Sequence, residues 1–307
     1  MKHRLYAYLN ITNPMVAWEV AIGRIKSSCD ISPNSFGTSI WAYSLLRELA
    51  LQGMNKRFHN EMMLESKRQH LSRGTVSRLS GVYFFESESD AFAAVERWGI
   101  PSRAQFISAV DFYPNRLTRV DSEWITSYIQ SDETDWMEHY WNGETLGQKP
   151  LTEVLASGIG QIRNLELRQR AVKQIYEKWT TSTPLLSMAC CGFADALMEE
   201  IAMVRPVISY ENGVIKGTHY FYIGDLEENQ ELLLMCLENC KARGEVLPMV
   251  VPDDGETFFK IPDFRHLDFE LKFKPASDTL AEIHAFASSS QPGQSQLIGS
   301  GVIVSPR

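Results

Sequence analysis

Short segments in which apolar and polar residues alternate recur in the first half of the chain, and each predicts a half-buried β-strand. These segments lie at residues 4–10, 81–86, 105–113 and 116–120. A longer apolar run at residues 153–162 is interrupted by Gly158 and Gly160 and predicts a pair of strands. Apolar positions at helical spacing predict helices over residues 13–28, 39–52, 88–98 and 122–130. Residues 27–38 are rich in serine, proline and glycine and predict a loop, whereas residues 54–71 predict a polar, basic helix or loop.

The pattern changes after residue 163. Helices are predicted over residues 165–179, 187–203 and 227–242, and the Asn212-Gly213 pair predicts a hairpin between strands at residues 207–210 and 217–223. Further short strands are predicted at residues 257–261 and 267–273. Because 307 residues suit two domains better than one, we expect an α+β domain at residues 1–163, a helical connector at 164–205 and a smaller α/β domain at 206–307.

Charge is distributed unevenly over these parts. The whole chain has a net charge of −8. Residues 1–163 carry 17 Lys and Arg against 18 Asp and Glu, whereas residues 164–307 carry 13 against 20, a net of −7. Residues 54–80 hold six cations and two anions. This patch of +4 could bind phosphates, although a solvated helix face has the same pattern.

The five cysteines do not suggest a disulfide framework, because their number is odd and their spacing is irregular. Cys236 and Cys240 share a helix face, but no His or Cys lies nearby in sequence to complete a metal site. We therefore expect buried thiols and no metal. The chain contains no run of about 18 apolar residues and no signal-peptide pattern, so we expect a cytoplasmic protein without a membrane segment.

One carboxylate, Glu153, stands at the start of the apolar run 153–162, directly after the glycine turn of residues 140–147. Upstream, the strand segment 81–86 follows Arg78 and leads into a helix, and the chain opens with the segment 4–10. In this order the three segments resemble the core of an ADP-ribosyltransferase domain, and the resemblance covers residues 4–163.

Particular residues carry this resemblance. Glu153-Val154-Leu155 fits the family's late-strand glutamate, and Trp141-x-Gly143 fits the turn before it. The segment from Arg78 to Ser87 fits the family's middle strand, in which an arginine precedes two aromatic residues and a small polar residue. The first strand departs from the pattern, since Ala7 or Tyr8 stands where the family has His or Arg. The residue two before Glu153 is Leu151 rather than Glu, which argues against an arginine-directed enzyme.

The resemblance implies a split β-sheet core and NAD as co-substrate. Breaking the bond between ribose and nicotinamide builds positive charge on the ribose, and a nearby carboxylate stabilises that charge. Glu153 is therefore the expected catalytic residue, at the mouth of a cleft between two small sheets, with Asp121 as a second acidic residue or, alternatively, a helix cap. The expected NAD-binding residues are Arg4, Tyr6, Tyr8, Arg78, Tyr83 and Phe85, with Arg78 near the pyrophosphate or the pocket rim.

The expected function is transfer of ADP-ribose to a macromolecular acceptor, protein or nucleic acid, as in bacterial or phage toxins and defence factors. An antitoxin or regulatory protein is a further expected partner, and the acidic residues from 185 onward are expected to recognise a protein. A non-catalytic binding module with the same fold is an alternative that the departure on the first strand favours. A glycan hydrolase that uses Glu153 with Asp121 or Asp135 is a third function, but the chain shows no array of substrate-binding tryptophans.

Overall fold

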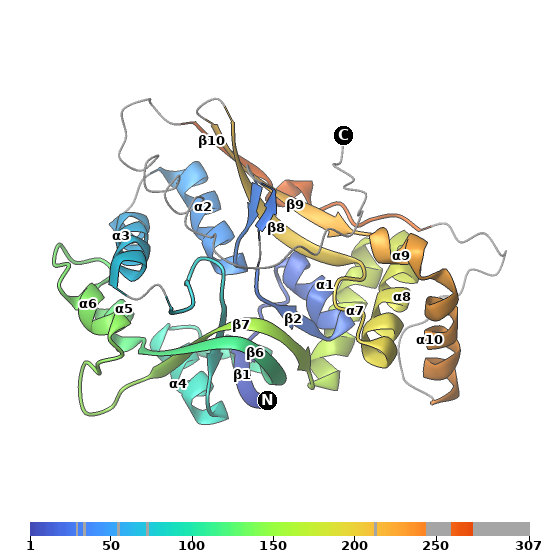
Figure 1. Cartoon of the computed structure of the whole chain (residues 1–307), viewed down its shortest axis with the longest axis horizontal. Helices are drawn as coiled ribbons and strands as arrows, with labels where there is room; N and C mark the ends of the chain where they lie inside the picture. Colours follow the sequence, from blue (N-terminus) through green and yellow to red (C-terminus); the bar gives the residue numbers. More distant parts are fainter. Residues whose placement is uncertain are drawn as a thin grey trace.

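Two five-stranded antiparallel sheets and the helices around them make up an α+β fold (Figure 1). The structure, a computed structural model, describes residues 1–28, 30–32, 35–53, 56–71, 74–211, 214–243 and 259–272. In Figure 1 the ribbon of β6 and β7 runs along the lower side, and β8, β9 and β10 form the upper side.

The first sheet contains the strands that the alternating segments predict. Its members are β1 (His3–Tyr8), β2 (Arg24–Lys26), β5 (Val82–Phe85), β6 (Ile107–Asp121) and β7 (Thr152–Ile162). Their order is β2-β7-β5-β1-β6, and β7 also pairs with β6, so the sheet closes on itself.

Three details of this sheet differ from the prediction. β2 lies within residues 13–28, for which a helix is predicted, because that helix ends at Ile22. The segments at residues 105–113 and 116–120 form one strand, with a register shift between Pro114 and Arg116, and residues 153–162 form one strand rather than two. Gly158 lies opposite Pro114 at this irregularity with φ of +139°. A Cβ atom there would lie 2.3 Å from the carbonyl oxygen of Tyr113. The glycine therefore permits the close approach of β6 and β7 instead of ending the strand.

The second sheet joins segments that are far apart in the sequence. It contains β3 (Asp30–Ser32), β4 (Ser35–Gly37), β8 (Met203–Glu211), β9 (Val214–Tyr222) and β10 (Phe269–Lys272), in the order β10-β9-β8-β4-β3. The hairpin of β8 and β9 confirms the prediction from Asn212-Gly213, which themselves lie outside the described residues. Residues 27–38 are not simply a loop, because β4 pairs with β8 and takes its backbone hydrogen bonds from that distant strand.

Most helices follow the predicted segments, with some different ends, but the helix at Trp136–Trp141 was not predicted. They are α1 (Pro14–Ile22), α2 (Ile40–Gln52), α3 (Lys56–Leu71), α4 (Glu88–Arg97), α5 (Glu123–Tyr128), α6 (Trp136–Trp141), α7 (Leu165–Lys178), α8 (Thr183–Ala196), α9 (Gly224–Glu228) and α10 (Gln230–Ala242). Asn13 caps α1 through the backbone N–H groups of Met15 and Val16, and Gly23 ends the helix with φ of +90°. The helix predicted to reach residue 203 ends at Ala196, because the chain turns there into β8.

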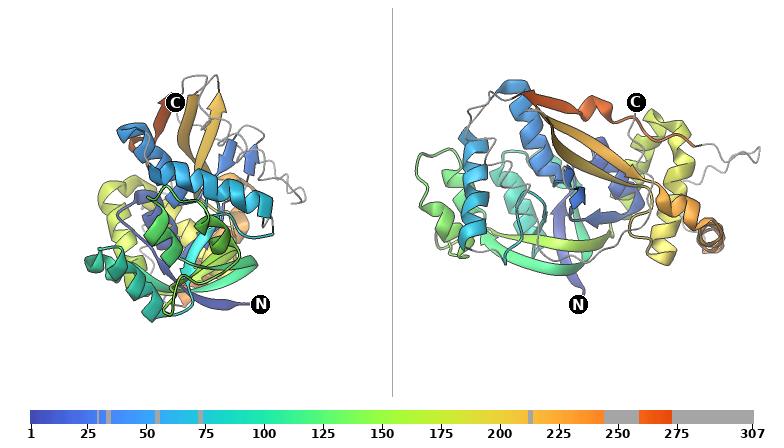
Figure 2. Two further views of the ribbon diagram at one scale, coloured as in Figure 1. Left: turned by 90° about the vertical axis from the view of Figure 1, so that its left-hand side faces the viewer. Right: turned by 45° about the horizontal axis from the view of Figure 1, so that its top comes forward.

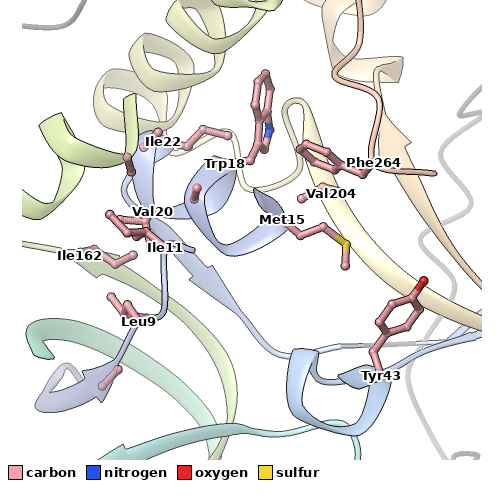
Figure 3. Packing of buried hydrophobic residues seen from close by; sticks show 14 of the residues in the cluster. Leu9, Ile11, Met15, Trp18, Val20, Ile22, Tyr43, Ile162, Val204 and Phe264 are labelled. Carbon is pink, nitrogen blue, oxygen red and sulfur yellow. The ribbon is translucent and has the colours of Figure 1, made fainter. Parts of the chain in front are cut away.

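One hydrophobic cluster includes residues from both sides of the predicted boundary at 163. The indole N–H of Trp18, on α1, donates to the carbonyl oxygen of Ala202 at 2.7 Å. Figure 3 shows Val20 of α1 beside Ile162, and Trp18 on the side of Val204 and Phe264. The structure thus differs from the predicted division into an N-terminal domain, a connector and a C-terminal domain, because the two halves share a core and the second sheet.

No helix in the described parts of the chain is both long and apolar enough to span a membrane. Of the strand predicted at residues 257–261, only residues 259–261 are described, and they are not in a strand.

Candidate functional site

One face of the first sheet carries most of the predicted site residues. Tyr6 of β1 lies opposite Phe85 of β5, and Phe85 lies opposite Glu153 of β7. Opposite residues of antiparallel strands project to the same face, and so do residues two apart on one strand. The shared face therefore bears Arg4, Tyr6, Tyr8, Tyr83, Phe85 and Glu153.

Helix α4 covers one end of this face. Phe85 is 2% exposed and packs in a small cluster with Ala91 and Val95 of α4. Tyr8 lies edge-on to Trp98, with ring centroids 6.0 Å apart. Phe85 is therefore a packing residue, and the structure places Tyr6 and Tyr8 partly buried beside it, while Arg4 is exposed.

Glu153 lies at the other end of the face, under α3 and α6, and is 5% exposed. Its Oε2 atom accepts a hydrogen bond from Arg78 Nη1 at 2.7 Å and one from the hydroxyl of Tyr140 at 3.4 Å. Burial raises the pKa of the Glu153 carboxyl, and the charge of Arg78 offsets part of that rise. The expectation that Glu153 is open at the mouth of a cleft is corrected, because helices cover this end of the sheet.

Arg78 lies between two carboxylates. Its Nε atom donates to Glu61 Oε2 at 3.2 Å and its Nη2 atom to Glu61 Oε1 at 3.5 Å, while Nη1 reaches Glu153 and the Tyr140 hydroxyl. Burial alone would lower the pKa of Arg78, but the charge of Glu61 and the surrounding acidic groups raise it above its usual range. The side chain is 5% exposed, so the structure places Arg78 in an internal ion-pair cluster and not at an exposed rim.

Three aromatic rings surround the Arg78 guanidinium. The Cζ atom lies 5.1 Å from the centroid of Tyr83, 5.2 Å from that of Trp41 and 5.7 Å from that of Tyr140. These are cation–π distances, and the hydroxyl of Tyr83 also donates to the carbonyl oxygen of Arg78 at 2.6 Å. Tyr140 is fully buried, whereas Trp41 and Tyr83 are half-buried. Among the three rings, Trp41 and Tyr83 are thus the ones that connect the cluster to solvent.

Helix α3 builds the cluster because its two acidic residues are buried, and its ribbon lies beside that of α6 (Figure 2). Glu61 and Glu65 are one turn apart on its buried face. Glu65 pairs with Arg68 at 2.7 Å and accepts a hydrogen bond from Ser77 Oγ at 2.8 Å. Two of the six cations in the predicted phosphate-binding patch, Arg68 and Arg78, are therefore buried in ion pairs. They do not form the basic surface that the charge count suggested, and Arg73 lies outside the described residues.

Asp121 is 2% exposed and holds backbone groups. Its carboxylate accepts hydrogen bonds from the N–H groups of Glu123 at 3.0 Å, Leu146 at 2.9 Å and Leu151 at 3.0 Å. On β6 it is Val120, and not Asp121, that lies opposite Glu153. These contacts fix the start of α5 and the loop before β7, which agrees with the alternative of a capping role. Asp135, the other acid considered for glycan hydrolysis, is exposed beside α6.

A substitution can separate the structural role of Asp121 from a catalytic one. Asp121→Asn replaces one acceptor oxygen by an amide donor that faces backbone N–H groups. We expect the free energy of unfolding to fall by about 1.5–3 kcal/mol, as measured by urea denaturation. The NAD turnover that the family resemblance implies should stay unchanged per folded molecule. Asp132→Asn is the control, because that side chain is 97% exposed. Loss of turnover at unchanged stability would instead identify Asp121 as catalytic.

The sequence patterns do not single out Glu61, Tyr140 or Trp41 as site residues. Glu61 and Glu65 were counted only as the two anions within a basic segment. Their spacing of four residues was the available signal, because it places both on one face of a helix. Trp41 lies in the predicted helix 39–52 and Tyr140 in the predicted glycine turn, and only the tertiary structure brings them to Arg78.

Among the described residues, the cysteines and the other metal-ligating side chains form no alternative centre. Cys190, Cys191, Cys236 and Cys240 are buried thiols, as predicted, and Cys29 lies outside the described residues. Within the part of the chain that the structure describes, no group of three or more His, Cys, Asp or Glu side chains is arranged to hold a metal ion. Scans against protein-family models and a search of curated proteins found no match for this chain.

Proposed function

We propose that this protein is an NAD-dependent ADP-ribosyltransferase that modifies a macromolecular acceptor, with Glu153 as the catalytic carboxylate. One observation carries the proposal. The three segments that resemble the family's core are neighbouring strands, β1, β5 and β7, and their register sets Tyr6, Phe85 and Glu153 on one sheet face. The split-sheet fold of this family would require β1, β5 and β7 to be neighbours. The order of these segments in the sequence does not by itself make them neighbours.

The proposed chemistry uses the charge of Glu153. As the bond between the anomeric carbon and nicotinamide nitrogen breaks, nicotinamide leaves with the electron pair and the ribose becomes cationic. The carboxylate stabilises that cation until a nucleophile of the acceptor attacks the anomeric carbon. Both hydrogen bonds from Arg78 and Tyr140 reach Oε2, so we assign Oε1 to the ribose. Because burial raises the pKa of Glu153, turnover should rise with pH as this carboxyl ionises.

In this proposal NAD approaches from the side of the half-buried rings, Trp41 and Tyr83, and its nicotinamide packs against one of them. The acceptor is assigned to surfaces of the second half of the chain. This half, residues 164–307, has a net charge of −7. A negative charge repels nucleic acid and so favours a protein acceptor. A toxin or defence role, with an antitoxin or regulatory protein as partner, is the biological setting that this activity suggests.

A second function, a non-catalytic binding module, is favoured by a different observation. Glu153 is already engaged in a buried ion pair with Arg78, and β1 lacks the family's His or Arg. A module of this kind would bind a nucleotide or protein without turnover. The glycan-hydrolase alternative has less support, because the Asp121 carboxylate is occupied by three backbone N–H groups.

Two assays test the proposal. The purified chain is incubated with NAD and the release of free nicotinamide is followed by chromatography. In parallel, biotinylated NAD is added with a cell lysate, and the labelled fraction is treated with protease or nuclease to identify the class of acceptor. We expect nicotinamide release and protease-sensitive label. Absence of both, with NAD binding retained, would instead support the binding module.

The aromatic contact makes a separate prediction. Tyr83→Ala should weaken NAD binding about three- to tenfold, because a stacked aromatic pair contributes about 0.5–1.5 kcal/mol. Calorimetry with Glu153→Gln as the background prevents turnover during the titration. Tyr83→Phe keeps the ring and should bind like its parent, and Phe92→Ala changes an exposed ring on α4 as a control. Equal affinities for Tyr83→Ala and its parent would exclude Tyr83 from the nicotinamide contact.

A further inference from the structure

We propose that Glu61 of α3 is a positioning residue that orients the catalytic Glu153 through Arg78. This inference rests on the proposed function for the role of Glu153, and it adds a residue that the resemblance to the family does not include. It starts from the juxtaposition of Glu61, Arg78 and Glu153 in the interior, where the three side chains are 1%, 5% and 5% exposed.

The guanidinium of Arg78 presents different edges to its two acidic partners. Glu61 occupies the edge formed by Nε and Nη2, and Glu153 accepts from Nη1 at 2.7 Å. A guanidinium is planar and rigid, so a carboxylate that holds one edge also fixes the direction of the remaining N–H groups. Glu61 therefore determines where Nη1 points, and Nη1 determines where Oε2 of Glu153 lies.

Helix α3 is itself anchored well enough to serve as the support. Glu61 and Glu65 contact the consecutive residues Arg78 and Ser77. The side-chain amide of Asn60, also on α3, donates to the carbonyl oxygens of Ile129 and Ser131, which follow α5. The indole of Trp141 donates to the carbonyl oxygen of Leu64 at 2.7 Å. The path from α3 to Glu153 thus consists of hydrogen bonds of 2.7 to 3.5 Å between buried groups.

Glu61 also acts on Glu153 by charge. The ionisable groups that interact with the Glu153 carboxyl are Arg78, Glu61, Tyr140 and Tyr83, and Arg78 is the cation among these four. The negative charge of Glu61 adds to the effect of burial and raises the pKa of Glu153, whereas Arg78 lowers it. Removing that charge without changing the shape should therefore let Glu153 ionise at lower pH.

The variant Glu61→Gln tests both effects. The amide oxygen can still accept from Arg78 Nε, so the chain should fold. We expect the acid limb of kcat/KM for NAD hydrolysis to move to lower pH and kcat to fall about tenfold or more, with KM within about twofold. Glu61→Asp keeps the charge but shortens the side chain, so it should restore the acid limb while kcat stays reduced. Glu138→Gln, which neutralises an exposed carboxylate on the neighbouring helix α6, is the control and should leave the pH profile in place.

The outcomes distinguish this inference from the proposed function. If the wild-type chain releases no nicotinamide, the proposed function fails; the effect on Glu153 is then measured by carboxyl ¹³C NMR titration of the wild type and Glu61→Gln. An active wild type whose Glu61→Gln variant has the same acid limb, or an NMR titration that does not move, would overturn the positioning role. If Glu61→Gln does not fold, an unchanged kcat in Glu61→Asp would overturn it equally.

Discussion

Glu153→Gln should lower NAD turnover by about 10²–10³-fold, the usual effect of removing one preorganised charge at a developing ionic centre. The amide has the same shape as the carboxyl and can still accept the hydrogen bond from Arg78 Nη1. It cannot supply the negative charge that stabilises a cationic ribose. Nicotinamide release under saturating NAD is the measurement, and circular dichroism verifies the fold.

The control for this prediction is Glu86→Gln. Glu86 ends the neighbouring strand segment, pairs with Arg119 at the surface and has a side chain that is 47% exposed, so its neutralisation should leave turnover unchanged. Nicotinamide release at the wild-type rate by Glu153→Gln would remove this residue from the mechanism and favour the binding module.

The variant Glu153→Gln should also change how the stability of the chain depends on pH. The pKa of Glu153 is raised above its ordinary value of 4.5 in the folded chain. A carboxyl with a raised folded-state pKa contributes most to stability when it is protonated, and this contribution is lost as pH rises from 4.5 through the folded-state value. Glu153→Gln removes this dependence. Its free energy of unfolding should therefore decline less than that of the wild type as pH rises from 4.5.

Periodicity predicted β1, β5, β6 and β7 of the first sheet as strands because their pattern is local, but it did not predict β2. The alternation of Leu5, Ala7 and Leu9 with polar or aromatic neighbours reports directly which face of β1 is buried. The short strands β3 and β4 could not be predicted in this way. β4 pairs with β8, about 170 residues later in the chain, and β3 pairs with β4. Segments rich in serine and glycine form strands only when a distant edge supplies hydrogen bonds.

The candidate site shows the same division between local and distant information. The sequence pattern singles out Glu153 and predicts a strand around it. The alternation of apolar and polar residues indicates on which face of the sheet a side chain lies, but not which element covers that face. Helix α3 covers it, and the partners Arg78 and Glu61 meet because a helix and a loop 17 residues apart fold against each other. Burial of the ion-pair cluster therefore depends on the tertiary structure, and the net charge of residues 54–80 does not indicate it.

Arg78→Met should destabilise the chain by about 3–5 kcal/mol, because it leaves Glu61 and Glu153 buried without their shared cation. For a chain of this length the loss corresponds to a decrease in Tm of about 5–8 °C in a cooperative transition. Differential scanning calorimetry and urea denaturation at neutral pH provide the measurement. Arg119→Met is the control. Its ion pair with Glu86 is about half exposed on both sides, so its effect should stay within about 0.5 kcal/mol.

The effect of Arg78→Met should also depend on pH in a defined direction. Arg78 lowers the pKa of Glu153, so its removal raises that pKa further and makes the ionised carboxyl more costly in the folded state. The destabilisation should therefore be largest near pH 8 and smaller near pH 5, where the buried carboxyls take up protons on folding. Adding Glu61→Gln and Glu153→Gln to the same chain removes both buried charges and should recover part of the lost stability. If the triple variant is no more stable than Arg78→Met at pH 8, then lost packing and not unpaired charge is the cause of the destabilisation, and the cluster is not held together in the way its geometry indicates.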